Sequence, residues 1–191
     1  ILGVKSQEII FTGGCTEANN LAIRGVMDQY PEGRVLISAI EHDSVLEPAQ
    51  QYACGIIPVD SAGVIDLEAA ERLISDDTVL VSCMYANNEI GTVQPLRKLG
   101  SLVEAERKRR GPQGMPIYLH TDAAQAANYF PLLAHSLKVD MMSLNSGKIY
   151  GPKGVGCLYV GAHVQLRAQQ LGGGQERGLR SGTEHVAGIV G

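Results

Sequence analysis

The sequence lacks an apolar run near the roughly 18 residues that a membrane-spanning helix needs. It also lacks a recognisable signal peptide. It has no excess of positive charge either, because 16 Lys+Arg against 20 Asp+Glu give a net charge of −4. That balance argues against a broad nucleic-acid-binding surface. We therefore expect neither a membrane nor a nucleic acid among the direct partners.

Paired cysteines are also missing. The chain has four cysteines, far apart and without C-x-x-C spacing, which argues against a disulfide framework and against a zinc site. Reduced thiols of this kind are typical of a cytosolic protein, so we expect a cytoplasmic location. The four residues are Cys15, Cys54, Cys83 and Cys157.

The composition that remains is that of a folded globular protein. Hydrophobic residues make up 45% of the chain and charged residues 19%, which excludes a disordered, collagen-like or coiled-coil protein. A length of 191 residues suits one domain or slightly more. Because the chain starts at Ile1 rather than Met and stops at Gly191, we expect it to be part of a longer protein.

Short β-rich runs alternate with helical patterns along the chain. Strand-like runs without a polar face indicate a mostly parallel sheet with helices on both faces, a three-layer α/β fold. We expect strands near residues 8–12, 35–38, 56–59, 78–84, 116–120, 139–144 and 154–160. We expect helices over 16–30 and 44–53, one capped by Asp66, and one from Pro95 to the basic run 107–110.

The basic run 107–110 has two interpretations. It could form a binding patch, but cations at a helix C-terminus also offset the helix dipole, and Gly111 then stops the helix. We favour the second interpretation.

In parallel α/β sheets, ligands bind beyond the carboxyl ends of the strands. After the first strand, Gly13 and Gly14 precede Cys15 and Thr16 at a helix start, which suits an anion such as phosphate. A plain N-cap is the alternative there. His42 follows the second strand, where it could stack on a planar ligand, shuttle a proton, or be an ordinary loop residue.

Three further strand ends carry polar groups. Asn87 and Asn88 could hydrogen-bond a ligand or form a turn. Asp122 could hold a protonated ring nitrogen; metal binding together with His120 is less favoured because no third ligand is near in sequence. Lys148, among small residues, suits an amine that reacts with an aldehyde, although a phosphate-binding or surface lysine is the plainer interpretation. Together these are the contacts that pyridoxal phosphate needs.

The same stretches resemble the cysteine desulfurases of the NifS/IscS-like group, in the class V branch of the fold-type-I pyridoxal-phosphate enzymes. The resemblance runs over essentially the whole chain and implies the large, cofactor-binding domain, with the N-terminal segment and the small C-terminal domain absent from residues 1–191. The matching stretches are 11–22, 41–42, 87–91 (Asn-Asn-Glu-Ile-Gly), 120–125 (His-Thr-Asp-Ala-Ala-Gln), 148–154 and 172–183, which includes Gly-Gly-Gly-Gln-Glu-Arg-Gly.

The resemblance implies a role for each matching residue. Lys148 matches the lysine that bonds to the cofactor aldehyde, and Asp122 the acid that keeps the pyridine nitrogen protonated. Gln125 matches the partner of the ring's phenolic oxygen, and His42 the imidazole that stacks on the ring and moves protons. The other matches are Cys15 and Thr16 at the phosphate, Asn88 at cofactor and substrate, and Thr183 at the phosphate of a neighbouring subunit's cofactor, which implies a homodimer.

The chain departs from the family at the lysine. The family shows Ser-x-His-Lys, whereas this chain has Asn145-Ser146-Gly147-Lys148. Asn145 and Ser146 can still donate to a phosphate, but the imidazole contact is lost. None of the four cysteines stands where the family's mobile, persulfide-forming loop would be.

The implied activity is removal of sulfur from L-cysteine, which leaves alanine and a persulfide. The sulfur then passes to an acceptor protein, either a scaffold for iron–sulfur cluster assembly or a factor for tRNA thiolation. We expect residues 1–191 alone to be inactive. The alternatives are a selenocysteine lyase, another class V lyase, or a non-catalytic scaffold. A nucleotide-binding Rossmann module is excluded because the glycine fingerprint is missing.

Overall fold

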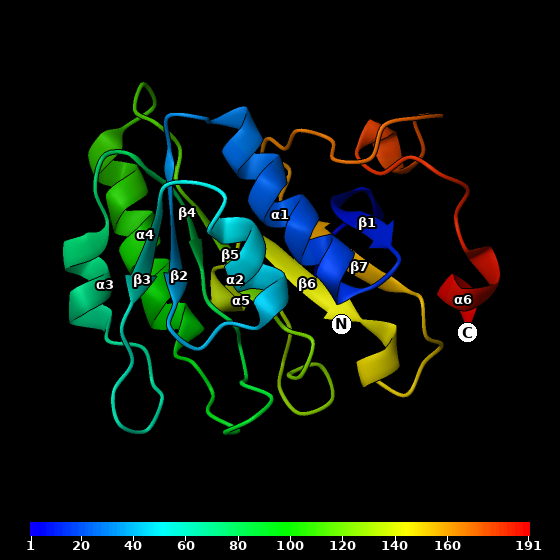
Figure 1. The fold of residues 1–191 in the computed structure, drawn as a ribbon, viewed down its shortest axis with the longest axis horizontal. Coiled ribbons are helices and arrows are strands. Elements are labelled where there is room, and N and C mark those ends of the chain that lie inside the picture. The colour runs from blue at the N-terminus through cyan, green and yellow to red at the C-terminus, as the bar shows by residue number, and fades with distance from the viewer.

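The computed structural model describes residues 1–191. Its strands form one seven-stranded sheet (Figure 1). The strand order is β1-β7-β6-β5-β4-β2-β3. Neighbouring strands from β3 to β6 are parallel, and β7 runs antiparallel to both β6 and β1. The strands are β1 (Ile9–Thr12), β2 (Arg34–Ser38), β3 (Cys54–Ile57), β4 (Thr78–Ser82), β5 (Tyr118–Asp122), β6 (Met141–Asn145) and β7 (Gly156–Val160).

Helices cover both faces of this sheet, so the three-layer prediction is confirmed. One buried cluster joins α1 and α2 to residues such as Ile10, Ile37 and Leu158 of the strands. The other joins α3 and α4 to the opposite side chains, such as Leu36 and Leu119. The helices are α1 (Cys15–Gln29), α2 (Asp43–Ala49), α3 (Leu67–Leu73), α4 (Leu96–Arg110), α5 (Ala134–Leu137) and α6 (Val186–Val190).

The local start and stop signals act as the sequence predicts. The Asp66 carboxylate accepts a hydrogen bond from the backbone N–H of Ala69 at 2.9 Å and so caps α3. Pro95 immediately precedes α4, and Gly111 ends that helix with a positive φ of 66°. Three short 3₁₀ turns were not predicted: η1 (Ser6–Glu8), η2 (Ser146–Lys148) and η3 (Glu176–Gly178).

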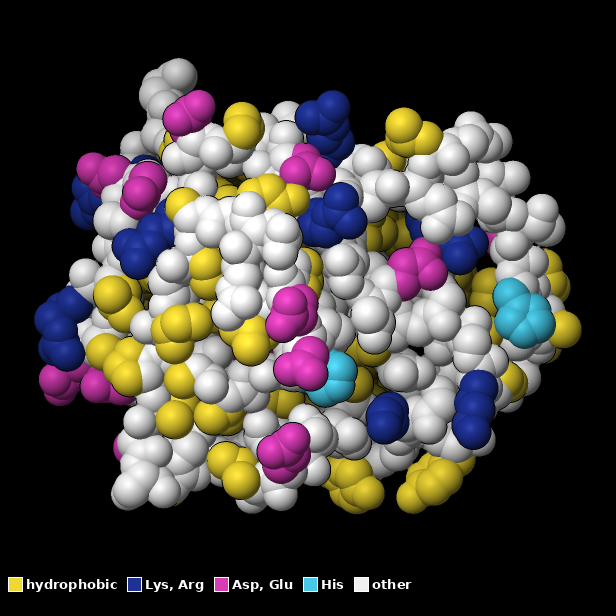
Figure 2. All heavy atoms as spheres, viewed as in Figure 1, with side chains coloured by type: hydrophobic (Ala, Val, Ile, Leu, Met, Phe, Trp, Pro, Cys, Tyr) yellow, Lys and Arg dark blue, Asp and Glu magenta, His cyan; other side chains and the backbone are white.

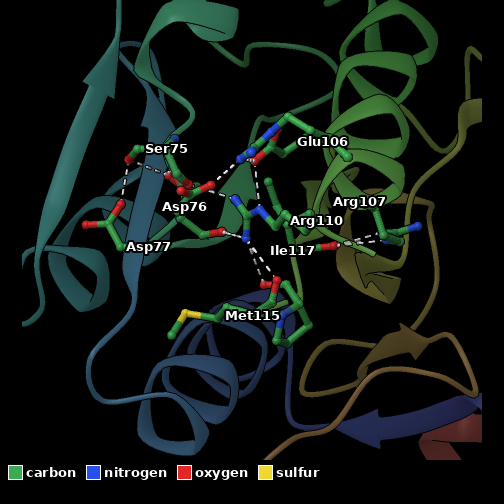
Figure 3. Close-up of polar contacts among 11 residues, drawn as sticks. Ser75, Asp76, Asp77, Glu106, Arg107, Arg110, Met115 and Ile117 are labelled. Atoms are coloured by element: carbon green, nitrogen blue, oxygen red, sulfur yellow. Dashed lines mark hydrogen bonds and ion pairs between the residues drawn. The ribbon is translucent and has the colours of Figure 1, made fainter. Parts of the chain in front are cut away.

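The basic run at the end of α4 is structural, and its main contacts lie beyond the helix itself. The Arg110 side chain is only 4% exposed and reaches from α4 toward Ser75 and Met115, whose carbonyls it binds (Figure 3). Arg107 donates to the carbonyl of Ile117 and to Asp140. The run thus joins the end of α4 to the segments that lead into β4 and β5.

The surface agrees with the balanced charge of the sequence. Figure 2 shows basic and acidic side chains intermingled over the face that α1 and α2 cover. None of the helices combines the length and the apolar character needed to cross a bilayer.

Candidate active site

A cavity of about 220 Å³ lies at the carboxyl ends of β4, β5 and β6. Lys148 and Asp122, the two residues on which the sequence prediction depends most, both line it. Apolar lining comes from Met84, Ala86 and Ala124. The remaining lining residues are Cys15, Thr16, His42, Ser44, Asn88, Gln125 and Asn145.

Asp122 is the last residue of β5, is buried, and accepts three hydrogen bonds. Its Oδ1 accepts from the Cys15 thiol at 3.3 Å and from the backbone N–H of Ala124 at 2.9 Å. Its Oδ2 accepts from the Asn19 amide at 2.7 Å. Four lone-pair positions on a carboxylate leave room for one further donor from a ligand.

The Cys15 side chain points toward Asp122, so this thiol and the cavity share one wall. Burial, together with the neighbouring Asp122 carboxylate, raises the pKa of the Cys15 thiol well above its ordinary value. Cys15 is therefore a neutral donor to Asp122. Only its backbone N–H remains for the phosphate contact that the sequence predicts.

His42 is the N-cap of α2, and its Nδ1 accepts from the Ser44 backbone N–H at 3.0 Å. The Ser44 hydroxyl lies 2.9 Å from the same nitrogen. The ring thus lines the cavity, with its Nε2 free of protein partners.

His120 lies inside the sheet below the cavity and is not a free ligand. Its Nδ1 pairs with the Ser82 hydroxyl at 2.8 Å and its Nε2 with the Ser143 hydroxyl at 3.0 Å. Burial lowers the pKa of His120 to about 4, against a smaller opposing effect from the Asp122 charge. The imidazole is therefore neutral and links β4, β5 and β6.

The start of α1 forms a second, open hollow of about 700 Å³, which shares Cys15, Thr16, Asn145 and Lys148 with the cavity. The backbone N–H groups of residues 15–17 donate to no backbone carbonyl, as expected for a first helical turn. Lys153 adds a second cation. Unpaired N–H groups and two lysines make this hollow suitable for an anion.

Two glycines make this helix start possible. Gly14 has φ 152° and ψ 179°, a conformation essentially restricted to glycine. Gly156 of β7 packs on it so closely that a Cβ at residue 156 would stand 2.7 Å from the Gly14 carbonyl carbon.

The asparagine pair divides into one turn residue and one cavity residue. The Asn87 side chain accepts from the backbone N–H groups of Glu89 and Ile90 and donates to the Ile40 carbonyl, so it forms the turn. Asn88 lines the cavity, as does Gln125. Neither of these two side chains is hydrogen-bonded within the protein, so both amides are available to a ligand.

Two predicted residues do not reach the cavity. Ser146 lies in η2 beside Gly151 and lines neither hollow. Thr183 lines a separate depression with Arg180 and Glu176. The implied role of Thr183 toward a neighbouring subunit stays a prediction.

The sequence analysis missed three residues: Asn19, Ser44 and Lys153. Asn19 stands four residues after Cys15 on the same face of α1, and this spacing could have revealed it. Ser44 follows His42 closely in the chain, and Lys153 lies in the matching stretch 148–154, where only Lys148 was given a role.

The residues present fit pyridoxal phosphate. A carboxylate, an amine and two free side-chain amides line one cavity. The adjoining hollow has the donors that a phosphate needs. Asn145 borders both spaces, although its Oδ1 is taken by the Gly147 N–H.

Comparison with known proteins agrees with this geometry. The family described as aminotransferase class-V matches residues 1–191. The chain belongs to the class-V aminotransferase family. Its relatives include the cysteine desulfurase IscS of Histophilus somni, which is 44% identical over all of this chain and 47% of its own length. The cysteine desulfurase of Homo sapiens is 42% identical, over all of this chain and 42% of its own length.

Solved structures confirm the fold that the resemblance implies. A NifS-like protein superimposes with a TM-score of 0.91 at 41% identity, over 99% of this chain and 52% of its own. The structure described as SspA in complex with cysteine also gives 0.91, at 35% identity, over 99% of this chain and 55% of its own. This class-V family chain therefore spans about half the length of the relatives it matches.

Proposed function

We propose that the complete protein is a pyridoxal-phosphate-dependent cysteine desulfurase, which takes sulfur from L-cysteine and leaves alanine. The observation that carries this proposal is the single cavity shared by the Lys148 amine and the Asp122 carboxylate. Two facts support it: the matched relatives carry the name cysteine desulfurase, and one superimposable structure is described as a complex with cysteine.

The residues that would hold the cofactor surround the cavity. Asp122 would keep the ring nitrogen protonated, Gln125 would meet the phenolic oxygen, and the backbone at Cys15 and Thr16 would bind phosphate. The Lys148 amine would bond to the aldehyde of the cofactor. When bound, pyridoxal phosphate supplies an aldehyde for amines and a cationic ring that withdraws electrons from the substrate carbon.

The chain's own groups would then handle protons and orientation. His42, capping α2 through Nδ1, presents Nε2 as the nitrogen that exchanges a proton with the ligand. The Lys148 amine is a second group able to carry a proton at the substrate carbon. Asn88 would orient the substrate, because its amide has no protein partner.

The finer aspects of the proposal concern partners and location. We propose that the sulfur leaves as a persulfide on a cysteine outside residues 1–191, for iron–sulfur cluster assembly or tRNA thiolation. Burial raises the pKa of the Cys15 and Cys83 thiols, so neither readily forms the nucleophilic thiolate that a persulfide-forming cysteine needs. We further propose a homodimer in which Thr183 contacts the neighbouring cofactor, and a cytoplasmic location, which four unpaired cysteines support.

The Lys148→Ala variant of the complete protein tests the proposal. We expect the parent to acquire a visible absorption band on addition of pyridoxal phosphate and to form alanine from L-cysteine. Lys148→Ala should lose both, because Lys148 is the only lysine among the residues that line the cavity.

Lys153→Ala is the matched control, since Lys153 lines the adjoining hollow but not the cavity. It should bind the cofactor more weakly and still show the band at saturation. A colourless parent, or a band that survives in Lys148→Ala, would contradict the assignment and favour a non-catalytic scaffold.

A further inference from the structure

Asn19 lies beneath the cavity and connects two of its walls. It is fully buried in α1, and both hydrogens of its side-chain amide are used. One is donated to the Asp122 Oδ2 at 2.7 Å and the other to the Ser44 hydroxyl at 2.8 Å. A carboxylate can only accept, so the amide nitrogen must face Asp122, and its second hydrogen then has to face Ser44.

This orientation fixes the direction of the next hydrogen bond. The Ser44 oxygen accepts from Asn19, so its own proton is free to be donated to His42 Nδ1, 2.9 Å away. The Ser44 backbone N–H donates to the same nitrogen at 3.0 Å. With two donors aimed at it, Nδ1 carries no proton, and the neutral ring must hold its proton on Nε2.

We propose that Asn19 and Ser44 are positioning residues that couple Asp122 to His42 and fix His42 as the Nε2–H tautomer. The series runs from the Asn19 amide to Asp122 on one side, and through the Ser44 hydroxyl to His42 on the other. It does not conduct protons, because the amide hydrogens of Asn19 stay on nitrogen. Its effect is to orient Asp122 and His42, two of the ionisable groups that line the cavity.

The functional meaning of this coupling rests on the proposed function. Asp122 and His42 would lie at the edge and at the face of the same cofactor ring, so a change at either would disturb the other. The Cys15 thiol completes the set as the second side-chain donor to Asp122. A purely structural role for Asn19 predicts a loss of stability without any change in the His42 tautomer.

The tautomer can be measured on the complete protein without cofactor, by solid-state NMR of ¹⁵N-histidine-labelled samples. The His42 signals are assigned by their loss in His42→Gln. We expect the parent to show a pure Nε2–H pattern. Ser44→Ala and Asn19→Leu should show the Nδ1 and Nε2 shifts moving part of the way toward each other. In both variants Nδ1 keeps the Ser44 backbone N–H, but it loses its hydroxyl donor or that donor is free to turn away.

Two further variants separate this role from general loosening of the fold. Ser44→Thr keeps the hydroxyl and should restore the pure pattern. Asn20→Leu changes the next residue of α1, whose amide donates to the Thr16 carbonyl, and should keep the pattern as well. If Asn19→Leu does not fold, Ser44→Ala against Ser44→Thr decides the result.

A folded Ser44→Ala protein that keeps the pure Nε2–H pattern would overturn the proposal. Cofactor binding is the second readout: Asn19→Leu should weaken pyridoxal phosphate about tenfold, since Asp122 loses a charge-assisted donor. A parent with the pure pattern and no cofactor binding would refute the proposed function and leave the hydrogen-bonded series intact.

Discussion

His120 shows how the sheet decides the state of a single ionisable residue. Its two ring nitrogens are bound by serines from the strands on either side, and it has no exposed surface. The sequence analysis considered His120 as a metal ligand beside Asp122 and disfavoured that role, and it gave no sign of the serine partners, because Ser82 and Ser143 are distant in the chain. Strand register brings the three together, with Ser82 directly opposite His120.

The lowered pKa of His120 predicts a pH-dependent stability. The folded value is about 4 and the ordinary value 6.5, so the unfolded chain binds the extra proton between these two pH values. The contribution is complete above pH 6.5 and is lost as the pH falls toward 4, by about 3 kcal/mol. In urea unfolding of the complete protein at pH 7, 5.5 and 4.5, the free energy of unfolding should fall less, or rise more, toward low pH in His120→Gln than in the wild type.

The exposed His185 supplies the control, and His185→Gln should keep the wild-type slope. Glu41 acts in the opposite direction: burial raises its pKa to about 8, so its contribution falls as the pH rises from 4.5 through 8. Because both His variants retain Glu41, the difference between them isolates His120. Equal slopes in the two variants would contradict the prediction.

At the scale of the element, arginine side chains hold the C-terminal end of α4 in place by binding groups outside the helix. Arg110 donates to Glu106 at 2.7 Å, to the Ser75 carbonyl at 2.7 Å and to the Thr78 carbonyl at 2.8 Å (Figure 3). Arg109 and Arg110 together lower the pKa of Glu106 to about 2. The dipole interpretation drawn from the sequence explained the charge of this segment but not these partners.

Arg110→Met should therefore destabilise the fold by about 3 kcal/mol, because the carbonyls of Ser75, Thr78 and Met115 and the Glu106 carboxylate lose a buried donor. Lys108→Met, at an exposed neighbour in the same run, should change the free energy of unfolding by less than about 0.5 kcal/mol. Chemical denaturation of both variants makes the comparison. Equal effects would mean that the run acts through net charge alone.

Strands were the elements that the sequence predicted best. All seven runs formed strands, because residues apolar on both faces can be buried only inside a covered sheet. Their ends shifted by about two residues, as at β5, which starts at Tyr118 and includes Asp122. The four-residue α5 gave no signal, since one turn of helix has no periodicity to detect.

At the scale of the whole molecule, two buried layers share one sheet, so we expect them to unfold together. Leu99 of α4 and Ile23 of α1 lie on opposite faces and are both fully buried. Leu99→Ala and Ile23→Ala should each cost about 2–5 kcal/mol. Amide hydrogen exchange should show the loss in both α1 and α4, whichever layer carries the substitution.

Ile56→Ala is the control, because Ile56 is 46% exposed, and it should cost much less than either core variant. Faster exchange confined to the layer that carries the substitution would mean that the two layers unfold independently.

The sequence by itself determined the layers, the order of the elements and the set of polar residues at the strand ends. Hydrophobic periodicity and glycine placement are local features, so they can be read directly from the sequence. Only the tertiary structure decided which groups meet: that the Cys15 thiol turns to Asp122, that Asn88 rather than Asn87 lines the cavity, and that Ser146 does not. These outcomes depend on strand register and on the close packing of β7 against Gly14. Both bring together segments that are distant in the chain, and a shift of a few ångströms between such segments would change which side chains are in contact.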